Sequence, residues 1–414
     1  MTRARRKRFV FLVRAFNDID HMTPLIDRLM ASSDFAVDVF CVNWNHDYRS
    51  NLNVQYLKKK WDLDFSYLWG GTESPISERV LLRAIDQVSA SVRFFRRRFS
   101  RLNKYRKKLE FWLYSRLRTD RIFADVTPAV VIFDWMNAEH PRNREIVRRC
   151  KARGISTVCL PHGVWIYSNK FASVKRNLAD PAKNIFYDLY PCPGRHKQYL
   201  LDRGIPEDRI VEVGSMRYSR IWLNVYENEI TTLPKADATN GSLRLVIFLS
   251  QSVYNVDNRA LSEMISTLAQ LPNIEIFIKP HTRGISPEYI QQIVGDRPIR
   301  VCTETSSVEL ISWADAAVVY GSSIAIQVLC QGKILLYPEF VDTNTVHFSD
   351  IGACWALRSV GEMVGAVRDL ANGHKKTPYT AREVDLFLND TVYAGKGQRD
   401  VIADHLTLIE GLEG

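Results

Sequence analysis

Short apolar runs alternate with helical patterns along the whole chain, and this alternation restricts the fold more than any other feature. In the first half, the apolar runs predict strands at Phe9–Val13, Ala36–Val42, Ala129–Phe133, Ser156–Leu160, Ile185–Leu189 and Ile210–Val213. In the second half, they predict strands at Leu243–Leu249, Ile274–Lys279, Ala316–Tyr320 and Ile334–Tyr337. Helical patterns fill the gaps, beginning with Thr23–Ala31. Strands separated by helices are typical of parallel sheets covered by helices.

A polar stretch rich in turn-forming residues, 226–242, separates the two halves. With 414 residues, the chain is long enough for two domains. We therefore expect an α/β protein with two doubly wound, Rossmann-like domains, made of residues 1–228, a linker at 229–242, residues 243–395 and a closing helix at 396–414. Ligands of open sheets bind beyond the carboxyl ends of the strands, which predicts a central cleft that both domains face.

The composition is that of a globular protein, with 46% hydrophobic and 25% charged residues. No apolar run reaches the roughly 18–20 residues that a membrane helix needs. We expect the start of the chain to be a basic tail before a first strand rather than a signal peptide, because its apolar part is short and Arg14 interrupts it. Seven scattered cysteines without a Cys-x-x-Cys pair favour reduced thiols in a cytoplasmic protein and provide no zinc motif.

Much of the net charge of +10 is concentrated at residues 94–121, within a predicted helical segment at 78–121. Arginines and lysines are interleaved there with Phe, Leu, Trp and Tyr, which suits a helix on an anionic membrane surface. A long helix packed on its own domain with a solvated basic face remains an alternative. Nucleic acid is a weaker one, because no recognisable nucleic-acid-binding module accompanies the charge. We expect a cytoplasmic protein, peripheral at the inner face of the membrane.

Cationic groups follow a predicted strand in the stretch IFIKPHTRG, residues 276–284. Lys279, His281 and Arg283 suit a phosphate or pyrophosphate, while Gly284 lets a ligand approach the backbone. A polar loop without a ligand is the simpler alternative.

A second strand-to-helix turn lies one βα unit further on, in the stretch ADAAVVYGSSIAIQVLCQGKILLYP at 314–338. Gly321, Ser322 and Ser323 open a helix whose N–H groups can bind an anion through the helix dipole. Gln327, one turn further in, could reach a ribose or a base edge. Glu309, on the preceding helix, is expected to be solvated.

The stretch STVCLPHGVW places His162 beyond a strand of the first domain, and VVIFDWMNAEH ends another strand in Asp134. An imidazole and a carboxylate at neighbouring strand ends make a plausible electrophilic partner and a base or nucleophile. Helix capping by Asp134 and a structural histidine are the alternatives.

LPHG, IKPH and GSSIAIQ followed by GK, in that order, resemble the GT-B group of capsule and surface polysaccharide transferases over about residues 128–340. That group includes bacterial Kdo transferases, CDP-glycerol glycerophosphotransferases and polysialyltransferases. The resemblance implies a nucleotide-activated donor held by the second domain, an acceptor held by the first, and no metal or other cofactor. It also implies that Lys279, His281, Ser322 and Ser323 hold the donor phosphate.

Three positions depart from the usual pattern of that group. Thr282 replaces the proline of Lys-Pro-His-Pro, Ile334 replaces the proline after Gly-Lys, and Gln327 replaces a glutamate. The last change leaves open which atom of the nucleotide is contacted there.

We therefore expect a metal-independent glycosyltransferase that acts on a bacterial surface polysaccharide or lipid-linked acceptor. The resemblance alone favours a CMP-activated sugar acid such as Kdo. A UDP-sugar hexosyltransferase or a nucleotide-sugar epimerase of the same fold is one alternative, and a non-catalytic polysaccharide assembly protein is another.

Overall fold

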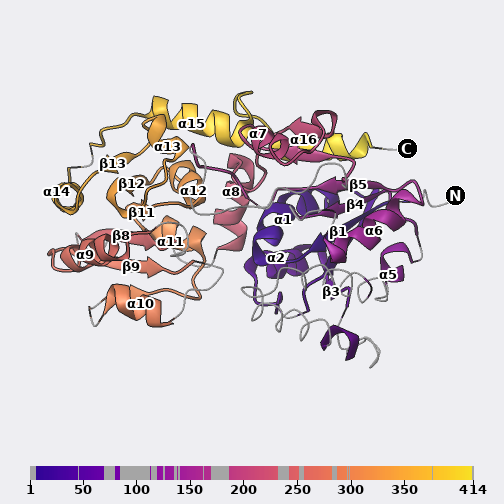
Figure 1. Cartoon of the computed structure of the whole chain (residues 1–414), viewed down its shortest axis with the longest axis horizontal. Helices are drawn as coiled ribbons and strands as arrows, with labels where there is room; N and C mark the ends of the chain where they lie inside the picture. The colour runs from indigo at the N-terminus through magenta and orange to yellow at the C-terminus, as the bar shows by residue number, and fades with distance from the viewer. Residues whose placement is uncertain are drawn as a thin grey trace, which may run out of the picture. The chain divides into compact units, whose positions relative to one another are not determined.

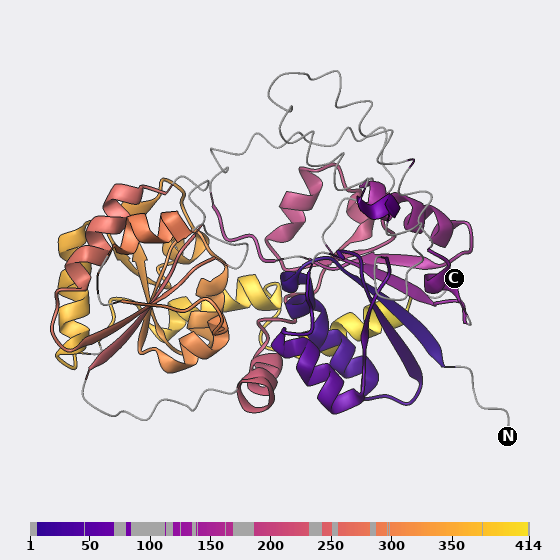
Figure 2. The same ribbon diagram turned by 90° about the horizontal axis from the view of Figure 1, so that it is seen from below.

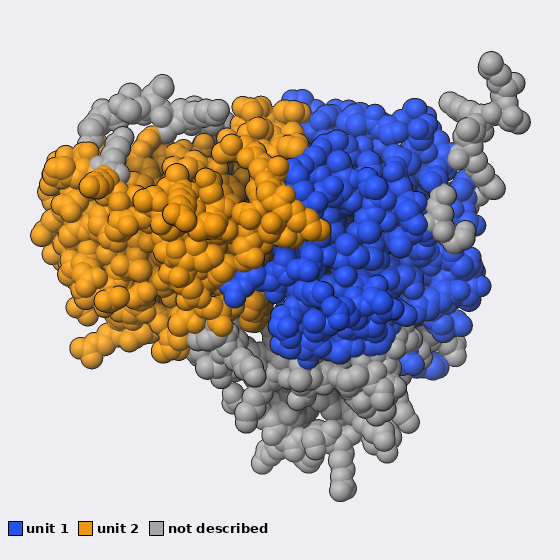
Figure 3. All heavy atoms as spheres, turned by 90° about the horizontal axis from the view of Figure 1, so that it is seen from above, with its two compact units in different colours: residues 1–163, 178–217, 399–414 blue, residues 164–177, 218–398 orange. Residues whose placement is uncertain are grey.

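The computed structural model describes residues 6–44, 46–69, 80–83, 112, 119–124, 126–134, 138, 140–161, 163–168, 186–231, 242–250, 256–281, 287–295, 297, 299–374 and 376–412. The chain divides into two compact units (Figure 3). Unit 1 comprises residues 1–163, 178–217 and 399–414, and unit 2 comprises residues 164–177 and 218–398.

Unit 1 is built on a parallel five-stranded sheet in the order β3-β2-β1-β4-β5 (Figure 1). Its strands are β1 (Lys7–Val13), β2 (Phe35–Cys41), β3 (Phe65–Tyr67), β4 (Val130–Phe133) and β5 (Ser156–Cys159). The last five residues of β1 are all buried, as expected for an apolar strand covered on both faces. From β1 the chain adds β2 and β3 on one side of the sheet and then β4 and β5 on the other side. The direction in which strands are added therefore reverses between β1 and β4. This reversal is the topological switch point at which ligands of such sheets bind.

The helices of unit 1 include α1 (Phe16–Met30), α2 (Leu52–Trp61), α5 (Asp120–Phe123), α6 (Pro141–Lys151), α7 (His196–Leu201) and α16 (Val401–Glu410). Helix α1 packs against both α2 and α16, so the end of the chain returns to cover the first helix. A salt bridge between Arg28 and Asp400, 2.8 Å long, joins these two helices. A small parallel pair, β6 (Tyr190–Cys192) and β7 (Ile210–Glu212), completes the unit.

Unit 2 contains a parallel six-stranded sheet in the order β10-β9-β8-β11-β12-β13. Figure 2 shows this sheet with helices around it. Its strands are β8 (Leu243–Phe248), β9 (Ile274–Lys279), β10 (Arg300–Val301), β11 (Ala316–Val319), β12 (Ile334–Pro338) and β13 (Trp355–Leu357). The central strand β8 buries Leu245, Val246 and Ile247 completely. Burial of each such side chain contributes about 1.5–3 kcal/mol. The order reverses between β8 and β11, which is the switch point of this sheet.

Two groups of helices accompany the sheet of unit 2. Helices α9 (Asn258–Leu268), α10 (Pro287–Val294) and α14 (Val360–Ala371) pack together, as do α11 (Ser307–Trp313), α12 (Ile324–Cys330) and α15 (Ala381–Tyr393). Helices α8 (Arg220–Val225) and α13 (His347–Asp350) and the π-helical turn η3 (Tyr226–Ile230) are the remaining main elements. No helix in the described ranges is long and apolar enough to cross a bilayer.

Several expectations from the sequence differ from the structure. The strand predicted at Ile185–Leu189 is wrong over residues 186–188, where the chain bends at Asp188. The carboxylate of Asp188 accepts hydrogen bonds from the backbone N–H and hydroxyl of Thr157, and the strand begins at Tyr190. Helix α1 begins at Phe16 rather than near Thr23, since Pro24 is accommodated inside it.

The unit boundaries also differ from the predicted ones. Residues 399–414 belong to unit 1 and residues 164–177 to unit 2, and the division falls after Arg217. Most of the predicted linker and nearly all of the basic segment at 94–121 lie outside the described residues.

Two buried histidines of unit 1 predict a loss of stability in acid. His405 is fully buried in α16, where its Nδ1–H donates to Val401 O at 2.8 Å, and burial lowers its pKa to about 4. Burial, helped by Arg203, lowers the pKa of His196 to about 3. Between these values and about 6.5, the unfolded chain binds protons that the folded chain does not, so stability falls as the pH decreases from 6.5 to 4.

His405→Leu should weaken this acid dependence. The change in free energy of unfolding between pH 7 and pH 4 should shrink by about 3 kcal/mol, measured by urea unfolding. The matched control is His374→Leu, at an exposed position, which should leave the pH dependence unchanged. An unaltered pH dependence in His405→Leu would show that His405 is not buried in its neutral form.

Candidate functional site

The loops that follow β8 and β11 meet at the switch point of unit 2. The hydroxyl oxygen of Tyr320, just after β11, accepts a hydrogen bond from the backbone N–H of Ser250, just after β8, at 3.4 Å. The next residue, Gly321, has a left-handed backbone with φ of 57°, which glycine adopts without strain. The two strand ends are therefore held together around a turn that favours glycine.

Three oxygen-bearing side chains converge on Gly321. A Cβ atom added to this glycine would lie 3.2 Å from Tyr167 Oη, 3.4 Å from Asp342 Oδ2 and 3.5 Å from Ser250 Oγ. The Tyr167 hydroxyl donates to Gly321 O at 2.8 Å. Ser250 Oγ is buried and has no hydrogen-bond partner among the described residues. The polar cluster of Tyr167, Ser250 and Asp342 therefore retains hydrogen-bonding capacity for a hydroxylated ligand.

Asp342 is held firmly in the loop after β12. Its Oδ1 accepts from the backbone N–H of Asn344 at 2.7 Å, and its backbone forms an antiparallel bridge with Val256. Its carboxyl group is 8% exposed, and burial raises its pKa to about 6. A buried carboxyl with a raised pKa beside a strand end is typical of a functional site.

Lys279 is the last residue of β9 and His281 follows the strand two residues later, at the same edge of the sheet. Lys279 is nearly buried, and its Nζ donates to Thr303 O at 2.6 Å, while burial lowers its pKa. Its ammonium group is thus held by the protein itself at this edge. His281 is half-buried, and Arg283 lies outside the described residues.

The serine turn that opens α12 has local partners. Ser322 Oγ accepts from the backbone N–H of Ile324 at 3.4 Å, and Ser323 Oγ accepts from the Tyr218 hydroxyl at 3.3 Å. Gln327 is buried, with 2% exposure, and its Oε1 has no partner in the described ranges. Glu309 is also buried rather than solvated, because it forms a capping box with Ser306 at the start of α11.

Asp134 follows β4 at the switch point of unit 1, next to the end of β1. Its Oδ2 lies 2.8 Å from Nε of Arg14, and the carboxyl group is only 4% exposed. Asp18 lies nearby, and its Oδ2 accepts from the backbone N–H groups of Arg14 and Ala15 at 2.9 and 2.7 Å. Burial and the negative charge of Asp18 raise the pKa of Asp134, and Arg14 opposes that rise. The arrangement is a carboxyl pair with one cation at a strand end.

Sequence reasoning missed Arg14, Asp18, Tyr167, Ser250 and Asp342. Arg14 and Ser250 directly follow predicted strands, and this position at a strand end could have marked them as candidate site residues. The other residues come to the site from a helix or a loop, and no motif marks them. His162 lies outside the described residues, so its predicted role stays a prediction.

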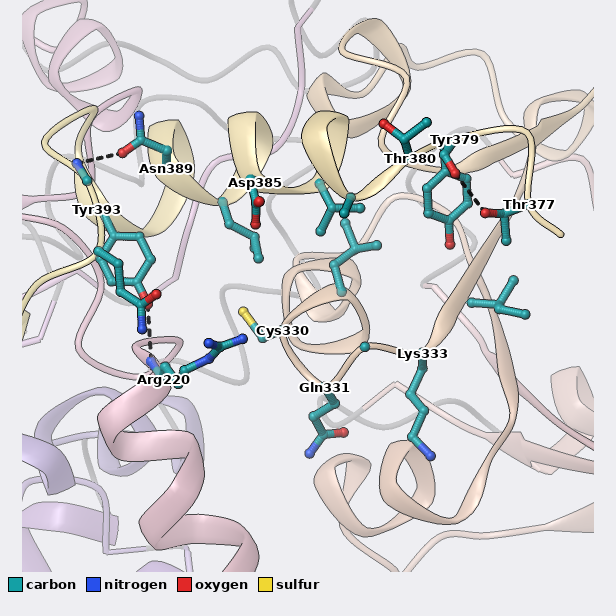
Figure 4. A pocket seen from close by; sticks show the side chains of 18 residues that line it. Arg220, Cys330, Gln331, Lys333, Thr377, Tyr379, Thr380, Asp385, Asn389 and Tyr393 are labelled. Atoms are coloured by element: carbon teal, nitrogen blue, oxygen red, sulfur yellow. Dashed lines mark hydrogen bonds between the residues drawn. The ribbon is translucent and has the colours of Figure 1, made fainter. Parts of the chain in front are cut away.

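A cavity of about 800 Å³ lies elsewhere in unit 2, where α12 leads into the amino end of β12 (Figure 4). Arg220 and Asp385 extend into it from α8 and α15 (Figure 4). None of the predicted site residues that the structure describes lines it. The candidate site therefore rests on the convergence of side chains at the switch points rather than on this cavity.

Comparisons with known proteins identify the fold. No family model matches the chain, and no curated protein matches its sequence. Solved structures match over nearly the whole chain at low identity. S. aureus MnaA in complex with UDP has 12% identity and a TM-score of 0.58, with 98% of this chain and 97% of that one covered.

Two further structures agree. The UDP-GlcNAc 2-epimerase of Neisseria meningitidis bound to UDP-GlcNAc has 12% identity, a TM-score of 0.55, and coverage of 98% and 100%. The glycosyltransferase of kitacinnamycin has 12% identity, a TM-score of 0.55, and coverage of 99% and 100%. The predicted fold class is confirmed: this is an α/β protein with two parallel sheets and a GT-B-like fold.

Gly321→Ala tests the packing of the polar cluster. The added methyl group would occupy the space between Tyr167, Asp342 and Ser250 and would strain a left-handed backbone, at a cost of about 1–3 kcal/mol in the free energy of unfolding. Gly332→Ala is the matched control, because its φ is 65° and nothing lies within 4 Å of the added atom. Urea unfolding should show the larger loss for Gly321→Ala. Equal losses would mean that the cluster is not tightly packed.

Proposed function

We propose that the chain is an enzyme that uses a nucleotide-activated sugar and transfers the sugar to an acceptor. The observation that carries this proposal is the convergence of Tyr167, Ser250 and Asp342 on Gly321 at the switch point of unit 2. Ligands of open α/β sheets bind at such points. The Asp342 carboxylate can accept from the vicinal hydroxyls of a ribose or a sugar, and the Ser250 hydroxyl can donate to them, whereas the Tyr167 hydroxyl donates to Gly321 O and holds the turn.

The phosphates of the donor have suitable partners at the same edge. Lys279, His281, Ser322 and Ser323 all follow the carboxyl ends of β9 and β11. Arg283 belongs to the same loop in the sequence. Because solved structures with this fold contain UDP or UDP-GlcNAc, uridine diphosphate is the nucleotide we favour first. A CMP-activated sugar acid such as Kdo remains the finer proposal that the resemblance supports.

In this proposal, the acceptor is a bacterial surface polysaccharide or a lipid-linked glycan. The basic residues at 94–121 would favour an anionic membrane surface, where such acceptors are found. Asp134 would serve as base or nucleophile, and burial and the neighbouring Asp18 raise its pKa above that of an ordinary carboxyl group. His162 would stabilise the departing nucleotide or the sugar carboxylate.

Epimerisation of a nucleotide sugar is the second candidate. The pair of Asp18 and Asp134 favours it, because two neighbouring carboxyl groups in unequal environments can remove and return a proton. Epimerisation would need no acceptor, whereas transfer requires one. The two candidates therefore differ in a way that turnover assays can separate.

Thermal unfolding with UDP, CMP, CDP and GDP tests the nucleotide proposal. A nucleotide at about 100 times its dissociation constant should add roughly 2.7 kcal/mol to stability. We expect UDP to raise the unfolding temperature of the wild type and to have much less effect on Asp342→Asn. A wild type unaffected by any of the four nucleotides would contradict the proposal and favour a non-catalytic assembly protein.

Asp342→Asn should also change stability in a pH-dependent way. The raised pKa means that folded Asp342 holds its proton up to about pH 6, so wild-type stability falls as the pH rises from about 4 to 6. At pH 7 the variant should therefore be more stable than the wild type without ligand, by up to about 3 kcal/mol, and this gain should vanish near pH 4. Asp369→Asn, at an exposed position, is the control.

Asp134→Asn tests the catalytic role in unit 1. Loss of a general base should reduce turnover by about 10²–10⁴-fold, measured as release of nucleotide with acceptor present and as epimerisation without it. The UDP-induced shift in unfolding temperature should persist. The exposed Asp202→Asn should retain turnover as a control. Full turnover in a folded Asp134→Asn would exclude Asp134 as the base or nucleophile.

A further inference from the structure

A short extended segment, residues 164–168, is part of the stretch 164–177, which belongs to unit 2 although residues 1–163 and 178–217 belong to unit 1. It is named the strap below. Backbone N–H groups of His347 and Ser168 donate to Ile166 O and Thr345 O at 2.8 and 3.1 Å, and Tyr167 forms an antiparallel bridge with Val346. The hydroxyl groups of Ser168 and Thr345 form a further hydrogen bond of 3.0 Å. The strap is therefore fixed to the loop after β12 as a short added strand.

Burial fixes the strap further. Val164 and Ile166 are buried, with 8% and 2% exposure, and the ring of Trp165 packs edge-on against that of Tyr167 at 5.3 Å. Residues that alternate along an extended segment point to opposite sides. The buried residues therefore hold the strap, while Tyr167 between Ile166 and Ser168 directs its hydroxyl to the carbonyl of Gly321 at 2.8 Å.

The loop after β12, to which the strap is hydrogen-bonded, also contains Asp342. Asp342 accepts from the backbone N–H of Asn344, and the Asn344 carbonyl accepts from the Tyr337 hydroxyl at 3.0 Å. One continuous set of hydrogen bonds thus joins the strap, the loop of Asp342 and the left-handed turn at Gly321. The orientation of the Gly321 carbonyl therefore depends on Tyr167, which lies 154 residues earlier in the sequence.

We propose that Tyr167 is a positioning residue for the nucleotide site: its hydroxyl holds the Gly321 carbonyl and thereby keeps the turn of Gly321, Ser322 and Ser323 in the shape that receives the donor. This inference rests on the proposed function and identifies the strap as the segment that holds the nucleotide site in shape. Tyr167 acts through Gly321, so its loss should weaken binding without removing a charged group. Preorganising a binding loop improves affinity because less ordering remains for the ligand to impose.

Tyr167→Phe in the full chain tests the proposal, because only the hydroxyl is removed. Loss of a hydrogen bond worth about 1–1.5 kcal/mol should raise the dissociation constant of UDP by about 5–10-fold, measured by calorimetry. The matched control is Tyr379→Phe. This change also removes a tyrosine hydroxyl in unit 2 that is hydrogen-bonded to the backbone, since the Tyr379 hydroxyl accepts from Leu335 N–H at 3.0 Å. This control should lose similar stability but retain the wild-type affinity for UDP.

Amide hydrogen exchange without nucleotide provides a second readout. Tyr167→Phe should speed exchange in peptides that cover residues 318–330 and leave those covering β8 unchanged. Unchanged exchange at 318–330 would overturn the positioning role, whether or not any nucleotide binds. Equal UDP affinity in wild type and Tyr167→Phe would overturn it while leaving the proposed function intact. Failure of the wild type to bind any nucleotide would instead refute the proposed function.

Discussion

The left-handed turn at Gly321 is the constraint on which the candidate nucleotide site depends. It lies where the strand order of unit 2 reverses, and the hydrogen bond from Ser250 N–H to the Tyr320 hydroxyl joins the loops after β8 and β11 there. A Cβ atom at this position would lie tightly against the Tyr167 hydroxyl and in contact with Asp342 and Ser250. Glycine therefore leaves room at the point where three polar side chains from distant parts of the chain come together.

Burial decides which of the charged groups can act. Lys279 and Asp134 both lie at strand ends, where phosphate binding and catalysis need charged groups in fixed positions. The structure pairs Lys279 with Thr303 O and Asp134 with Arg14. Pairing lowers the energetic cost of burying a charge, but it also holds the group in place. The carboxyl group of Asp342 accepts from the backbone N–H of Asn344, and burial raises its pKa to about 6.

The GT-B-like fold is retained at 10–15% identity because it depends on patterns rather than on particular side chains. Parallel strands buried on both faces need apolar runs, and the helices between them need one apolar face. Many sequences satisfy these conditions. Function depends on a few residues at the strand ends, and these can differ widely between proteins of one fold.

The sequence by itself determined the two-sheet α/β architecture, because the alternation of apolar runs and helical patterns is local information. It also located the strand ends after β4, β9 and β11, and with them Asp134, Lys279, His281 and the Gly321 turn. Only the tertiary structure decided which groups face one another. Tyr167, Ser250 and Asp342 lie far apart in the sequence. They meet because β8 pairs with β11 and because the strap pairs with the loop after β12. Neither periodicity nor a motif in the sequence indicates those contacts. The short strand β13 and the turn at Asp188 escaped prediction for the same reason, since hydrogen bonds to distant residues define them.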